Sequence, residues 1–91
     1  MSSEPAEDVD MSDGMALALR QGIRAERSRV RLSQEDLAER LGWSRSTLTA
    51  VEAGTRTIQA HELPELCGAL GVTLAELLAR APAEDRRRMG I

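Results

Sequence analysis

Aromatic side chains are nearly absent from this sequence: Trp43 is the only one in 91 residues, with neither Phe nor Tyr. Leu and Ala supply most of the apolar content. Both are strong helix formers, whereas strands favour aromatic and β-branched residues, so we expect an all-α fold. A chain of this length forms one small domain at most, without room for a deep catalytic cleft between two lobes.

The sequence also has one cysteine, one histidine and no long apolar run. Cys67 cannot form an internal disulfide and lies in an apolar stretch, which indicates a buried thiol and a cytoplasmic location. A spanning helix needs roughly 18 apolar residues and a signal peptide needs a basic start, so we expect neither. His61 has no Cys or His partner at ligand spacing, so we expect no metal site, no cofactor and no enzyme activity.

Lysine is missing altogether, and all 12 basic residues are arginine. The net charge of -3 is unusual for a nucleic-acid binder, but the charge is unevenly divided along the chain. Residues 1–13 hold five acids and no base, which leaves 12 arginines against 10 acids in the remainder. The guanidinium fork suits phosphates and guanine edges, although a GC-rich genome would also favour arginine. The remainder is therefore mildly basic.

Composition divides the chain into three parts. Residues 1–13 are small and acidic without hydrophobic periodicity, which is typical of a disordered tail. Residues 14–81 combine apolar residues at helical spacing with successive cap residues, and they predict five helices. Residues 82–91 follow Pro82 and are rich in arginine, and we expect them to form a short, frayed tail.

Cap residues set the bounds of the central helices. Ser33 with Asp36 forms a capping box that starts a helix at residue 34, and Gly42 ends it. Ser44 then caps a third helix, which Gly54 closes.

The remaining helices have bounds of the same kind. A first helix covers about residues 15–30. Pro64 fits only the first turn of a fourth helix that begins near residue 62 or 63, and Thr73 with Glu76 forms the capping box of a fifth.

Residues 34–53, QEDLAERLGWSRSTLTAVEA, have the spacing of a helix-turn-helix. Ala38 stands where two helices crossing at roughly 90–120° would touch, and a larger side chain there would separate them. Gly42 makes the turn. Apolar residues at four further positions hold both helices against the rest of the domain: Leu37, Leu41, Leu48 and Val51.

The segments LSQEDLA, LG, SRSTL, VEAG and LGVTLAELL, in that order, resemble the XRE family, the Cro and phage-repressor type of helix-turn-helix, over about residues 19–80. The resemblance implies a compact five-helix, lambda-repressor-like domain whose third helix, about residues 45–53, enters the DNA major groove. It also implies a structural ion pair between Arg27 and Glu52. Arg20 and Arg24 on the first helix are most simply interpreted as a solvated face, with a DNA-backbone contact as the alternative for Arg24.

The first turn of such a third helix faces base edges. Arg45 is the first candidate, because it can donate two parallel hydrogen bonds to guanine O6 and N7. Ser46, Thr47 and Thr49 can bond bases or phosphates. Ala50 offers only a methyl group, suited to thymine, where relatives often carry a long polar side chain.

Three further residues are candidates for the DNA backbone. Gln34 lies at the amino end of the second helix, where free N–H groups favour a phosphate, and the family places a DNA-contacting Gln there. Ser44 has two possible roles, as a cap and as a contact, and Arg56 matches a family position that commonly meets the backbone. Trp43 either packs over the second helix or lies against DNA, and we favour packing.

These observations predict a sequence-specific regulator of transcription, a repressor that binds double-stranded DNA as a homodimer on an inverted repeat. We expect the dimer surface on the fifth helix and the segment after it, with exposed apolar residues at Leu74, Leu77, Leu78 and Met89. The alternative is an antitoxin or adaptor that engages a partner protein through the same fold, using the acidic tail or the last helix.

Overall fold

The computed structural model describes the backbone of residues 3–91 and the side chains of residues 14–91. This part of the chain is helical without a strand, which confirms the all-α class. None of its helices is long and apolar enough to cross a membrane. The helices are α1 (Ser3–Arg29), α2 (Gln34–Leu41), α3 (Arg45–Ala53), the 3-10 helix η1 (Ala60–Glu62), α4 (Leu63–Leu70), α5 (Leu74–Leu77) and α6 (Ala83–Met89).

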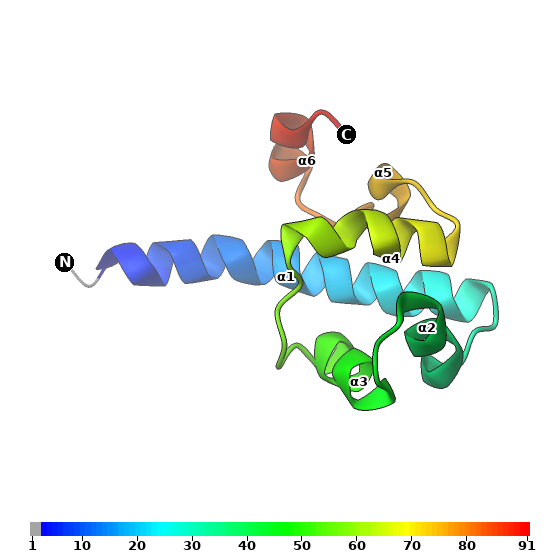
Figure 1. Cartoon of the computed structure of the whole chain (residues 1–91). Helices are drawn as coiled ribbons and strands as arrows, with labels where there is room; N and C mark the ends of the chain where they lie inside the picture. The colour runs from blue at the N-terminus through cyan, green and yellow to red at the C-terminus, as the bar shows by residue number, and fades with distance from the viewer. Residues whose placement is uncertain (1–2) are drawn as a thin grey trace.

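Helix α1 is the longest helix, and three other helices pack against it. Its second half contacts α3, α4 and α5, while its first turns extend beyond the other helices (Figure 1). The sequence predicts a disordered tail over residues 1–13, yet α1 begins at Ser3 and Gly14 lies inside it. Acidic residues in the first turns of a helix interact favourably with its dipole, which composition alone does not reveal. Residues 1–2 lie outside the described part, and the domain boundary at Gly14 stays a prediction.

One fully buried side chain from each of the first five α-helices meets in the core. These residues have 0% exposure and come from α1 to α5 in order: Ile23, Leu37, Leu48, Leu66 and Leu77. Burying a side chain of this kind stabilises the fold by about 1.5–3 kcal/mol. At Gly22, α1 comes so close to α5 that a Cβ would overlap the Leu77 carbonyl.

The predicted caps are present. Ser33 and Asp36 form a reciprocal capping box, and the backbone N–H of Ser33 holds the pKa of the Asp36 carboxyl below its ordinary value. Gly42 ends α2 in the left-handed region at φ 73°, which glycine adopts at low cost. Thr73 and Glu76 make the other predicted capping box, at α5.

The C-terminal segment differs from the expectation. Residues 82–91 are not a frayed tail, because Ala83–Met89 forms α6. Acids lie in its first turn and arginines in its last, Gly90 caps it in the left-handed conformation, and Arg88 pairs with Glu84 at 3.1 Å.

The expected apolar dimer surface was also partly wrong. Leu77 is fully buried and Leu78 is 3% exposed, because α5 is only one turn long and presses both side chains against α1. Leu74 is half-buried, and only Met89 is clearly exposed, at 43%.

Candidate nucleic-acid interface

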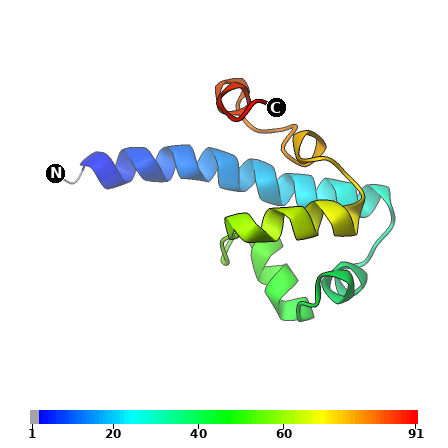
Figure 2. The same ribbon diagram turned by 45° about the horizontal axis from the view of Figure 1, so that its top comes forward.

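Helices α2 and α3 form a tight two-helix unit beneath α1 and α4 (Figure 2). Ala38, 2% exposed, lies in the core at the crossing, as its small size requires. The Ala38 carbonyl accepts a hydrogen bond from the Trp43 N–H at 2.8 Å, and the Glu39 carbonyl accepts one from Gly42 at 3.2 Å. The turn therefore satisfies the last carbonyls of α2 and directs the chain into α3.

The first turns of α3 present a polar face to solvent. Leu48 and Val51 point into the core, whereas Arg45, Ser46 and Thr49 are exposed. Thr47 and Ala50, also predicted to read bases, are half-buried at the edges of this face. Within the described residues, the Arg45 guanidinium has neither an ion-pair partner nor a hydrogen bond to another side chain, so its donors face solvent.

The hydroxyl of Ser44 is the N-cap of α3. It accepts the Thr47 N–H at 3.1 Å and lies 3.1 Å from the Ser46 hydroxyl and 2.9 Å from that of Thr47. One of the four unpaired N–H groups at the start of the helix is thereby satisfied. The cap fixes the turn that carries Arg45 and Ser46.

A buried carboxylate joins α1, α2 and α3. Glu52, 3% exposed, accepts hydrogen bonds from Arg27 Nε at 2.8 Å and from a second Arg27 nitrogen at 3.1 Å. Gln34 Nε2 donates to the same carboxylate at 3.0 Å. Such a two-point contact of guanidinium with carboxylate restrains both angle and distance. The structure thus brings together the predicted pair and a predicted DNA-backbone residue.

The Gln34 side chain has a fixed orientation. An ionised carboxylate can only accept, so the Gln34 amide must turn its NH₂ toward Glu52. Its oxygen then accepts from the Thr49 hydroxyl at 3.0 Å. Gln34 therefore connects the start of α2 to the exposed face of α3.

Arg20 and Arg24 also donate to α3, which the interpretation of them as a solvated face did not include, although Arg24 is exposed as that interpretation expects. Arg20 donates to the Ala53 carbonyl at 3.2 Å and Arg24 to the Glu52 carbonyl at 3.3 Å. Cations there complement the unpaired carbonyls and negative dipole at the end of α3. The sequence contains part of this signal, because Arg20, Arg24 and Arg27 recur at helical spacing. Their shared partner, α3, follows from the packing of α1 against it.

Arg56 is bound within the protein rather than directed freely toward a phosphate. Its guanidinium makes two hydrogen bonds to Glu62, at 3.1 and 2.9 Å, and its central carbon lies 5.0 Å from the centre of the Trp43 ring. The hydrogen bonds from Arg56, with one from the Gln59 N–H, lower the pKa of Glu62 to about 2. Trp43 is half-buried against the core, in agreement with packing.

Two observations bear on catalytic or metal chemistry. Cys67 is half-buried rather than fully buried, and this partial burial raises the pKa of its thiol. Among the described residues, no three His, Cys, Asp or Glu side chains gather in a way that would hold a metal ion.

Comparison with known proteins agrees with this geometry. A family model described as "Helix-turn-helix" matches residues 23–77. A solved structure, the "hypothetical transcription factor NHTF from Neisseria", is similar with a TM-score of 0.68 and 28% sequence identity, over 86% of this chain and 85% of that one. No curated protein matches. The matched residues contain α2, the turn and α3, and the chain therefore belongs to the helix-turn-helix family of DNA-binding domains, of the XRE type.

Proposed function

We propose that this protein represses transcription by binding an inverted-repeat operator as a homodimer, with α3 of each copy in the major groove. One observation carries the proposal: the first turn of α3 exposes Arg45 and hydroxyl groups, while the rest of that helix is held in place by the core and by arginines from α1. A rigid helix with unengaged donors at its amino end is what groove readout requires.

Base readout is assigned to the exposed face of α3. Arg45 donates to guanine O6 and N7, a contact that discriminates against other bases by about 1–3 kcal/mol. Ser46 and Thr49 bond neighbouring base edges, and Thr47 reaches a base or phosphate from the edge of the face. Ala50 contributes a methyl contact to thymine.

Backbone contacts come from the elements that flank α3. Gln34, held between Glu52 and Thr49, brings its free N–H groups at the start of α2 to a phosphate. Ser44 combines its cap with a phosphate contact. Arg56 contributes through its positive charge, and it reaches a phosphate by exchanging one of its Glu62 hydrogen bonds.

The homodimer is proposed because one such domain makes few contacts. Recognition helices about 34 Å apart reach successive major grooves on one side of B-DNA. With Leu77 and Leu78 buried, the proposed surface comprises the exposed sides of α5 and α6, with Leu74 and Met89 as its apolar part. Sedimentation at tens of micromolar, with and without operator DNA, tests it: a monomer under both conditions would exclude the dimer.

A protein-binding role is the second candidate function. Helix α1 extends beyond the other helices and bears the acidic segment, which offers a partner a surface separate from α3 (Figure 1). An antitoxin or adaptor would use this surface while keeping the same fold.

Selection of bound DNA from a random library at two salt concentrations separates the two functions. An enriched palindrome supports the repressor. Weak binding without enrichment, lost as salt rises, would show phosphate attraction alone and would favour a protein partner.

A further inference from the structure

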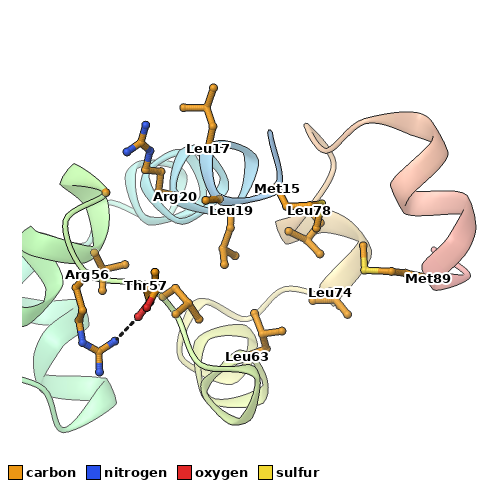
Figure 3. Close-up of a pocket in the computed structure, with 14 residues that line it drawn as sticks. Met15, Leu17, Leu19, Arg20, Arg56, Thr57, Leu63, Leu74, Leu78 and Met89 are labelled. Atoms are coloured by element: carbon orange, nitrogen blue, oxygen red, sulfur yellow. Dashed lines mark hydrogen bonds between the residues drawn. The ribbon is translucent and has the colours of Figure 1, made fainter. Parts of the chain in front are cut away.

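An apolar cavity of about 570 Å³ lies behind the interface, between α1, the loop after α3, and helices α4 to α6 (Figure 3). Its volume falls within the range of small-molecule sites. Most of its lining is aliphatic or thioether, including Met15, Leu17, Leu19, Leu63, Leu74 and Met89.

The polar groups of this cavity gather at one end. Arg20 packs against Gly54 and bonds the Ala53 carbonyl, and Arg56 and Thr57 follow directly along the chain. Figure 3 shows these three side chains on the side of the cavity away from Met89.

The two arginines at that end differ in charge balance. Glu62 neutralises Arg56, whereas Arg20 has no carboxylate within 4.0 Å in the described part of the chain. At one end of the apolar cavity, the Arg20 guanidinium therefore has no carboxylate partner among the described residues and donates to a backbone carbonyl.

The lining also restricts the chemistry of a ligand. It contains no aromatic ring, so a nucleobase or other flat ring finds no aromatic side chain to stack on there. Leucine and methionine side chains adapt to flexible chains, and a guanidinium binds a carboxylate through charge-assisted hydrogen bonds. We propose that the cavity binds an alkyl carboxylate, with its head group at Arg20 and its chain directed toward Leu74 and Met89.

A ligand in this position would contact the structures that support α3. Val51 of that helix, with Gly54 and Arg56 of the loop after it, forms part of the cavity wall. Binding of the carboxylate stands on the cavity alone, whereas an effect on DNA affinity rests on the proposed function.

Calorimetric titration of the full chain with decanoate and with decanol tests the assignment. We expect both ligands to bind saturably with dissociation constants below about 1 mM, and decanoate to bind more tightly than decanol. Arg20→Gln keeps a polar side chain but removes the charge, and it should weaken decanoate binding about tenfold while leaving decanol unchanged.

Arg24→Gln is the matched control. Arg24 lies one turn further along α1 and also donates to the end of α3, but it does not line this cavity. It should leave both affinities unchanged. Equal losses of decanoate affinity in Arg20→Gln and Arg24→Gln would overturn the assignment of the head group to Arg20. Equal losses of affinity for decanoate and decanol in Arg20→Gln would overturn it as well.

Ala16→Trp fills the cavity from an exposed position of α1, so it removes no core packing. It should abolish binding of both ligands while the melting temperature is retained. Absence of saturable binding to the unmodified chain would overturn the proposal. The proposed dimer surface shares Leu74 and Met89 with the cavity, so self-association that Ala16→Trp abolishes and decanoate does not affect would also overturn it, because a second copy would then occupy the cavity. DNA selection without ligand tests the proposed repressor independently of these results.

Discussion

The two ends of α3 have opposite environments. In its first turn, Arg45 and Ser46 are exposed and Arg45 is unengaged by other described side chains. In its last turn, Glu52 is buried and bonded to Arg27 and Gln34, and the carbonyls of residues 52 and 53 accept from two further arginines. A surface that must remain open for a ligand is thus held in position by contacts made at the other end of the same helix.

The largest expected effect on stability comes from disrupting the last turn of α3, where Glu52 is buried. Arg27→Ala would leave the Glu52 carboxylate buried without its main partner, which typically costs about 3–5 kcal/mol. Urea unfolding should show this loss. The double variant Arg27→Met with Glu52→Leu removes both charges and should recover much of it; if the double variant is as unstable as the single one, the stranded charge is not the cause.

A smaller loss of stability is expected when the N-cap of the exposed first turn of α3 is removed. Ser44→Ala removes the acceptor of the Thr47 N–H and should lower the free energy of unfolding by about 1 kcal/mol. Ser46→Ala is the matched control, because the Ser46 hydroxyl is exposed and caps no N–H group. We expect it to change stability by less than about 0.5 kcal/mol while weakening DNA binding. Equal destabilisation by both variants would contradict this division of roles.

The Arg56–Glu62 pair should give a dependence on pH. The folded pKa of Glu62 is about 2, below its ordinary value of 4.5, so the pair stabilises the fold fully above pH 4.5. That contribution is lost as pH falls from 4.5 toward 2. Glu62→Gln should remove this part of the acid dependence in thermal melts at successive pH values. Unchanged acid dependence in the variant would show that Glu62 is not its source.

Local signals in the sequence predicted much of the fold. Ser33, Gly42, Ser44 and Thr73 mark helix ends through contacts within a few residues, and the structure contains all four caps. The extent of α1 and the formation of α6 were not predicted, because acidic and arginine-rich segments resemble disordered tails in composition.

Contacts between distant elements were less accessible from the sequence. Glu62 follows Arg56 by six residues in a loop without periodicity, so their pairing depends on how η1 turns back. The burial of Leu77 and Leu78 depends on the close approach of α5 to Gly22. The apolar cavity requires five elements to meet, and no short pattern encodes it.

The most direct test of base readout by the exposed first turn of α3 is the DNA affinity of Arg45→Ala. It is measured on the selected operator and on operators in which each single base pair is changed. Arg80→Ala, an equal loss of charge at an exposed position outside α3, is the control. We predict that Arg45→Ala removes discrimination at one guanine, about 1–3 kcal/mol, with stability unchanged, while Arg80→Ala keeps it. A uniform loss on all operators, matched by Arg80→Ala, would mean that Arg45 contributes only charge and that the first turn of α3 does not read the sequence.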